Sequence, residues 1–233
     1  MSSSVPRKRI RKSPADRQAE IVATAAAVAL AEGLECVTLR RIGEELDVRP
    51  GLVSHYFPVA EDLVAEAFGT AAAGELDRLI PAERPDATPS THLARFLGEA
   101  AGEAYDDISR LWINARHLAR YRPALRERVL VQEAAWRERL EGLIREGVAR
   151  GEFRTPDPYA TAIHVLVVLD GLGAHANTGT PDRPAAITRL AATTAERELG
   201  LPPGTLAPPP TTPSAVPAVP AVPAVPPGPA APA

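Results

Sequence analysis

The chain has 233 residues, of which 45% are apolar and 24% charged, and this is the usage of an ordinary globular protein. Ala, Leu, Arg and Glu are abundant while aromatic residues make up only 4%, which predicts an all-α fold with a core of small aliphatic side chains. The single cysteine excludes an internal disulfide and a multi-thiolate metal site.

Positive charge is concentrated at the N-terminal end, although the net charge of the chain is −3. Residues 1–59 carry nine basic and seven acidic side chains, whereas residues 60–233 carry 17 and 22. Residues 1–13 hold five of the basic side chains and almost nothing to bury, so we expect a disordered basic arm there. A nucleic-acid partner would therefore meet this end of the chain.

Three short helices are predicted between residues 14 and 59. Ile21, Ala25 and Val28 recur at helical spacing before Gly33, which predicts a first helix over 15–32. Thr38 is placed to cap a second helix over 38–46. Pro50 suits the first turn of a third helix over 50–57, which Pro58 ends.

A larger helical domain is expected over 60–200. Apolar stripes predict helices at 60–79, 90–104, 106–120, 123–150, 157–177 and 183–199. From residue 201 to 233 the chain has 13 prolines and repeats Ala-Val-Pro four times, so we expect a disordered Pro-rich tail.

No targeting or membrane segment is visible in the sequence. The most apolar run, 160–169, is too short for a bilayer, which needs roughly 20 residues. The basic start is not followed by an apolar signal segment. We expect a cytoplasmic protein with no membrane partner.

The segment Thr38–Phe57 has the pattern of a helix-turn-helix. Its apolar positions supply a shared core for two steeply crossed helices, and Gly43 is small where those helices come closest. The second helix then points its first turns outwards, as a recognition helix does in the major groove. The candidate DNA-binding residues are Thr38, Arg40, Arg49, Gly51, Leu52, Ser54, His55 and Tyr56. From the pattern alone, a short helical hairpin with a solvated face remains an equal alternative.

Thr38 to Leu63, with the helix before it, resembles the DNA-binding domain of TetR-family regulators. The similarity is strongest in Ser54-His55-Tyr56-Phe57 and in Glu61-Asp62-Leu63. Asp47 stands where that family usually has Gly, and Ala60 where it usually has a phosphate-contacting Lys. The resemblance implies a sequence-specific regulator that binds a double-stranded DNA operator. Arg49 or the basic arm would replace the missing positive contact.

The remainder of the chain is similar, more loosely, to the ligand-binding domain of the BetI-type branch of that family. Trp112, His117, the segment 145–153 and the segment 169–172 carry this similarity. It implies a homodimer formed through the last two long helices, and an unidentified small-molecule effector that releases the protein from a palindromic operator.

Seven polar or aromatic side chains on apolar helix faces are candidates for a ligand pocket: Phe68, Trp112, Arg116, His117, Trp136, His164 and His175. Core packing is the alternative for each of them. His164 and His175 share nearly one helix face, but a metal site would need a third ligand, so we predict no metal and no cofactor.

The sequence shows no catalytic motif: it has no Gly-rich phosphate loop, no Gly-x-Ser-x-Gly and no His-Glu-x-x-His. We therefore expect a transcriptional regulator and not an enzyme. Two alternatives stay open: a helical binding or adaptor protein with a degenerate DNA-binding domain, which Asp47 and Ala60 favour, and an activator in place of a repressor.

Overall fold

The computed structural model describes residues 13–84, 87–102, 105–177 and 184–207. Within these ranges the chain is helical and forms no β-strand, which confirms the all-α prediction. The basic arm as far as residue 12 and the Pro-rich segment from residue 208 lie outside the described residues.

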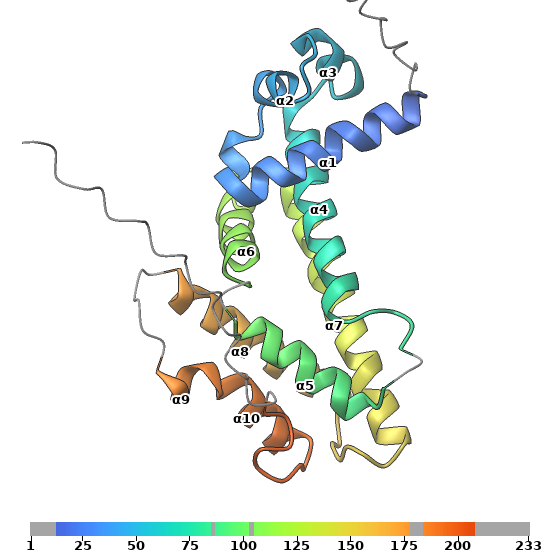
Figure 1. The fold of residues 1–233 in the computed structure, drawn as a ribbon, viewed down its shortest axis with the longest axis vertical. Coiled ribbons are helices and arrows are strands. Elements are labelled where there is room, and N and C mark those ends of the chain that lie inside the picture. The colour runs from blue at the N-terminus through green and yellow to red at the C-terminus, as the bar shows by residue number, and fades with distance from the viewer. Residues whose placement is uncertain (1–12, 85–86, 103–104, 178–183, 208–233) are drawn as a thin grey trace, which may run out of the picture.

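The first three helices form a compact unit at the top of Figure 1. They are α1 (Pro14–Glu32), α2 (Leu39–Glu45) and α3 (Pro50–Tyr56), with a short 3-10 turn, η1 (Leu34–Cys36), after α1. Capping fixes the starts of α1 and α2, because the Ser13 and Thr38 side chains accept hydrogen bonds from the backbone N–H groups of Asp16 and Arg41. These helices begin and end within one residue of the predicted bounds.

The turn between α2 and α3 brings the two helices close together. Asp47 has a φ of 51°, a left-handed conformation that favours glycine. A Cβ on Gly43 would lie 3.3 Å from the Pro50 Cα, so a larger residue there would push the helices apart. The fully buried side chains of Ile42 and Val53 pack beneath this crossing.

A long helix pair connects the N-terminal unit to the rest of the molecule. α4 (Ala60–Leu79) passes under α1 and then runs beside α7 (Pro123–Ala149), with α6 (Asp106–Ala119) packed against α7 and α8 (Figure 1). Ion pairs from Arg128 to Glu66 and from Arg139 to Asp77 join α7 to α4. One continuous apolar core runs from Ile21 in α1 to Leu206 near the end of the described chain.

The far end of the molecule is built from α5 (Pro89–Ala100), α8 (Pro158–Ala176), α9 (Ala185–Thr188) and α10 (Leu190–Glu198). α5 ends earlier than predicted, at a turn that includes Gly102. The helix expected over 183–199 is two helices, interrupted at Arg189. Side chains of Thr188 and Arg189 donate to the Ala185 carbonyl and compete with the backbone ladder at this point.

The packed chain extends beyond residue 200, where we had expected a tail without contacts. Leu206 is fully buried, and its backbone N–H donates to Oε1 of Glu196 at 2.8 Å. Two leucines in residues 201–207 give this stretch apolar surface to bury. The expectation of disorder from residue 201 is therefore wrong for residues 201–207.

α8 has much apolar surface that the other described residues leave uncovered. Among the described helices it is the one long and apolar enough to cross a membrane by length and composition, and only 28% of it is buried. Val167 is 61% exposed. Asp170 interrupts the apolar sequence and forms an ion pair with Arg116, as expected of a helix that packs within a protein.

Candidate DNA-binding surface and ligand cavity

Helix α3, which the sequence predicts to be the recognition helix, packs its inner face into the core and leaves its outer face exposed to solvent. Val53 is fully buried and Phe57, just after the helix, is nearly so. Arg49, Gly51 and His55 are exposed, whereas Leu52, Ser54 and Tyr56 are half-buried. The Ser54 hydroxyl donates to the Pro50 carbonyl at 3.1 Å.

The basic side chains of α2 are engaged by carboxylates on the protein surface. Arg40 is 83% exposed and forms a 2.8 Å ion pair with Glu44 one turn away. Arg41 hydrogen-bonds to Glu32 and Glu45, which raises the pKa of Arg41 and braces α2 against the end of α1. Because an exposed pair such as Arg40–Glu44 is weak, its guanidinium is available to a phosphate at little cost.

In addition to α4, helix α6 contacts the three-helix unit, through the η1 turn. The Asn114 amide donates to both oxygens of the Glu35 carboxylate at 2.9 Å, and its Oδ1 accepts the backbone N–H of Leu34, also at 2.9 Å. Leu34 is fully buried. α6 therefore holds the η1 turn directly.

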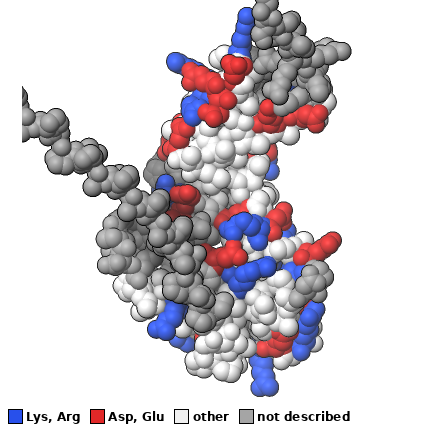
Figure 2. Space-filling model, viewed as in Figure 1, with Lys and Arg blue, Asp and Glu red and all other residues white. Residues whose placement is uncertain are grey.

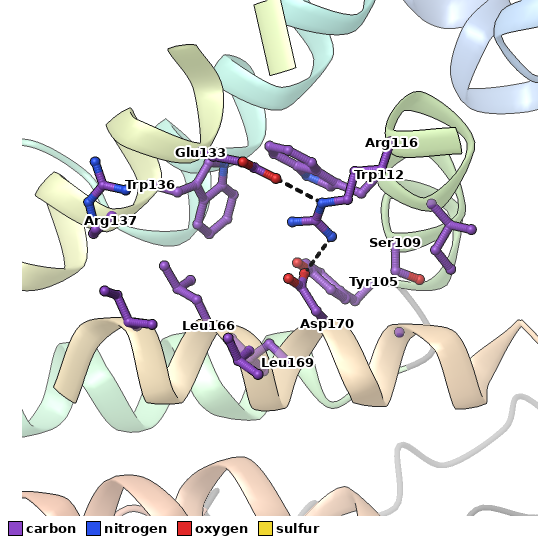
Figure 3. A pocket seen from close by; sticks show the side chains of 14 residues that line it. Tyr105, Ser109, Trp112, Arg116, Glu133, Trp136, Arg137, Leu166, Leu169 and Asp170 are labelled. Carbon is purple, nitrogen blue, oxygen red and sulfur yellow. Dashed lines mark hydrogen bonds and ion pairs between the residues drawn. The ribbon is translucent and has the colours of Figure 1, made fainter. Parts of the chain in front are cut away.

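A cavity of about 260 Å³ lies between α6, α7 and α8 (Figure 3). Its wall is aromatic and aliphatic with a few charged groups, which is the usual make-up of a small-molecule site. The lining residues that Figure 3 labels are Tyr105, Ser109, Trp112, Arg116, Glu133, Trp136, Arg137, Leu166, Leu169 and Asp170.

Arg116 is the centre of the charged groups in this cavity. Its Nε donates to Glu133 of α7 and its Nη1 to Asp170 of α8, each at 2.9 Å, and its guanidinium lies 5.0 Å from the centre of the Trp112 ring. Burial alone would lower the pKa of Arg116, but the two carboxylates raise it overall. Burial raises the pKa of Asp170, and Arg116 offsets part of that effect. One cation thus ties together three helices.

Two aromatic residues of the cavity wall, Tyr105 and Trp136, also carry hydrogen-bond donors. Burial raises the pKa of the Tyr105 phenol, so it stays protonated and can donate a hydrogen bond. Trp136 is only 4% exposed, and its Nε1–H has no acceptor among the described residues. A buried donor without an acceptor is costly, so an oxygen atom placed beside it would be stabilising.

The structure brings three of the seven pocket candidates together, namely Trp112, Arg116 and Trp136. Phe68 is fully buried behind Trp112, with the two rings edge-to-face at 5.0 Å between centres. His117 and His175 are exposed, and His164 forms a 3.2 Å pair with Glu198. Where the structure describes the chain, no three His, Cys, Asp or Glu side chains gather into a metal site.

Sequence reasoning missed Tyr105, Glu133 and Asp170. Asp170 had a usable signal, because it is the one Asp, Glu, Lys or Arg in the otherwise apolar segment Pro158–Ala176. Glu133 had none, since it is one of many acidic residues along α7. Elsewhere acidic and basic side chains are interspersed on the face seen in Figure 2, as expected of solvated helix faces.

A helix-turn-helix unit joined to a helical domain with a ligand-sized cavity is the architecture of a transcriptional regulator. Residues 21–67 match the family model for bacterial regulatory proteins of the tetR family, and residues 89–200 match the model for the C-terminal domain of BetI-type transcriptional repressors. No curated protein matches the chain. The chain belongs to the TetR family of transcriptional regulators, which confirms the resemblance.

Solved structures share the fold over most of both chains. A putative transcriptional regulator from Saccharomonospora viridis, in complex with choline, is 21% identical with a TM-score of 0.66, covering 79% of this chain and 98% of its own. A TetR transcription regulator from Haloarcula marismortui is 22% identical with a TM-score of 0.64, covering 80% and 97%. The multidrug binding protein EbrR, complexed with proflavin, is 27% identical with a TM-score of 0.54, covering 76% and 99%.

Proposed function

We propose that this chain is a homodimeric transcriptional repressor that binds a palindromic DNA operator and is released by a small molecule in the α6–α7–α8 cavity. The observation that carries the proposal is the double role of α6. This one helix supplies Trp112 and Arg116 to the cavity wall and Asn114 to the contact with η1. A ligand that shifts α6 therefore acts directly on the DNA-binding unit.

The start of α3 is the surface that would read the operator. Arg49, Gly51 and His55 are exposed there and can reach base edges in the major groove, with Leu52, Ser54 and Tyr56 beside them. Thr38 and Arg40 would contact phosphates and fix the register of the helix. The basic residues of the N-terminal arm would add the positive contact that Ala60 does not supply.

Dimerisation through α8 and α10 would cover the apolar face that the protomer leaves open. Ala160, His164, Val167, Gly171 and Ala174 lie on one stripe of α8 and are exposed or half-buried. The small residues of this stripe would let two copies of the helix approach closely. A twofold axis there would give the two α3 helices the separation of successive major grooves, roughly 34–36 Å.

Release of the protein from its operator would follow from a change in the position of α6 and of α4. Phe68 of α4 packs on Trp112 of α6, so the two helices would move together. The ligand must bind the DNA-incompetent arrangement more tightly, and a coupling of about 1–3 kcal/mol is typical of such regulators. The similar structures that contain choline and proflavin support a small-molecule effector in general. Such a regulator acts in the cytoplasm, where bacterial DNA is accessible.

The test is selection of genomic fragments by the purified full-length protein, followed by titration of the selected site against salt. Enrichment of one palindrome, bound as a dimer with affinity that falls as salt rises, is the expected result. Arg49→Ala and His55→Ala should abolish the preference for that site, while Glu138→Ala on the exposed side of α7 should not change it. Binding that is weak and indifferent to sequence would favour an adaptor protein with a degenerate DNA-binding domain.

A further inference from the structure

The polar end of the cavity already holds a cation. The Arg116 guanidinium lies between the carboxylates of Glu133 and Asp170 and over the Trp112 ring, as the dashed lines in Figure 3 show for the two ion pairs. The carboxylates come from α7 and α8 and the guanidinium from α6. This is the environment that proteins build for a cationic group: opposite charge on two sides and an aromatic face on a third.

The charges at this end of the cavity are not balanced. Two carboxylates face one guanidinium, and the side chains of Glu133 and Asp170 remain 37% and 49% exposed. The other lining cation, Arg137, lies apart from them in Figure 3, with its guanidinium 5.5 Å from the centre of the Tyr159 ring. The site around Arg116 therefore keeps a negative excess that a second cation can use.

We propose, building on the function above, that the effector is an organic cation with an apolar or aromatic body, and that its charged group exchanges with the Arg116 guanidinium. The ligand cation would pair with Glu133 and Asp170, while its body would lie against Trp112, Trp136 and Leu166. An anion would have to take Arg116 from two carboxylates that repel the anion itself. A neutral ligand could donate hydrogen bonds to the carboxylates but would lack the charge attraction that strengthens them.

The exchange explains how binding changes the protein. Arg116 is part of the chain, so its two ion pairs hold α6 to α7 and α8, whereas the charged group of a free ligand satisfies the same carboxylates with no covalent link to α6. The displaced guanidinium can move into solvent, since 36% of the side chain is already exposed. α6 would then be free to shift, together with its contact to η1 through Asn114.

The chain offers a direct assay, because both of its tryptophans, Trp112 and Trp136, line this cavity. Fluorescence titration of the purified full-length protein would compare benzylguanidinium with benzylurea, which has nearly the same shape without the charge, and with benzoate. We expect benzylguanidinium to bind about tenfold or more tightly than either. Equal binding of benzylurea, or tighter binding of benzoate, would overturn the proposal.

Substitutions of the two carboxylates and of Arg116 should change the affinity for benzylguanidinium in opposite directions. Glu133→Gln and Asp170→Asn should each weaken the binding of benzylguanidinium by about tenfold and that of benzylurea much less, with Glu138→Gln on the exposed side of α7 as the control. Arg116→Met should instead strengthen benzylguanidinium, because it removes the competing cation. Weaker binding by Arg116→Met, or unchanged binding by both carboxylate variants, would contradict the exchange. The carboxylate variants keep Arg116 and one of its partners, so they test the idea even if Arg116→Met folds poorly.

Operator release is measured separately, by fluorescence anisotropy of the selected DNA site. Selective binding of benzylguanidinium without release would uphold the ligand class and contradict the repressor mechanism. Release of the DNA by another class of compound, without binding of benzylguanidinium, would uphold the repressor mechanism and contradict the proposed ligand class.

Discussion

Asn114 and Glu35 are joined by two 2.9 Å hydrogen bonds between helix α6 and the turn that follows α1. The same asparagine accepts the backbone N–H of the fully buried Leu34. The contact is thus a three-bond link between the domain that lines the cavity and the domain that carries the recognition helix. Its strength can be measured without knowing the effector.

Asn114→Ala should lower the free energy of unfolding by about 1–3 kcal/mol, because it leaves the buried Leu34 N–H without an acceptor. Urea denaturation measures the change, and amide hydrogen exchange at Leu34 should accelerate. Glu35→Gln is the control, since it keeps the bond to Leu34 and should cost much less. A Leu34 amide that exchanges at the wild-type rate in Asn114→Ala would show that this link is not formed in solution.

Glu75 should make the protein less stable as the pH rises. Burial raises the pKa of this carboxyl from its usual 4.5 to about 8, and Arg78 compensates only in part. Between these two values the folded state binds more protons than the unfolded state, so stability falls with pH by at most about 1.4 kcal/mol per pH unit. Below pH 4.5 and above pH 8 the contribution no longer changes.

Glu75→Gln should remove this slope, which urea melts at pH 5 and pH 8.5 would detect. The variant should be more stable than the wild type at pH 8.5 and close to it at pH 5. Glu83→Gln, at an exposed position, should follow the wild type at both values. A difference between Glu75→Gln and wild type that is the same at both pH values would refute a buried, protonated Glu75.

Gly147 is required by the packing of Phe153, which is 2% exposed. A Cβ at position 147 would overlap the Phe153 ring, so Gly147→Ala should cost about 1–3 kcal/mol of stability. Gly142 lies on the same helix with open space around its Cβ, so Gly142→Ala should instead stabilise by up to about 1 kcal/mol. Thermal melts of the two variants should therefore move in opposite directions.

Gly171 tests the proposed dimer interface on α8. Its Cβ would meet no other atom within 4 Å in the protomer, so Gly171→Arg should fold normally and yet place a bulky charge in the interface. Sedimentation velocity should find a monomer. Gly142→Arg, which has the same open space on α7, is expected to remain a dimer. A dimeric Gly171→Arg would move the interface away from this face.

Asp47 holds a left-handed conformation at the turn of the helix-turn-helix, with a φ of 51°. Asp47→Gly should raise the free energy of unfolding by about 1 kcal/mol, since glycine adopts this conformation without strain. Asp47→Val should lower it, because a β-branched side chain is disfavoured there. If both variants lose stability, the Asp47 side chain contributes more than its conformation suggests.

Local signals in the sequence predict the N-terminal fold well. Thr38, Gly33 and Pro50 each act within one helical turn, so capping and proline geometry set the helix bounds without reference to the rest of the chain. The break at Arg189 is harder to predict, because it depends on side chains that compete for one carbonyl. The burial of Leu206 depends on the position of α10.

The cavity is less predictable, because its chemistry comes from pairs of distant residues. Trp112, Arg116 and Trp136 could be identified as polar or aromatic groups on apolar faces, but the partners of Arg116 are set by how α6, α7 and α8 cross. Asp170 could have been found as a lone carboxylate in an apolar helix. The orphan N–H of Trp136 becomes visible only when the packing is known.

The anchoring of Leu206 on Glu196 fixes the place of the last described residues, 201–207, on the folded protein. That point adjoins α10, at the opposite end of the molecule from α3 in Figure 1. A fluorophore or affinity tag attached at residue 207 would therefore lie far from the recognition helix. Labelled or immobilised protein could be used for operator measurements without an obstruction at the DNA.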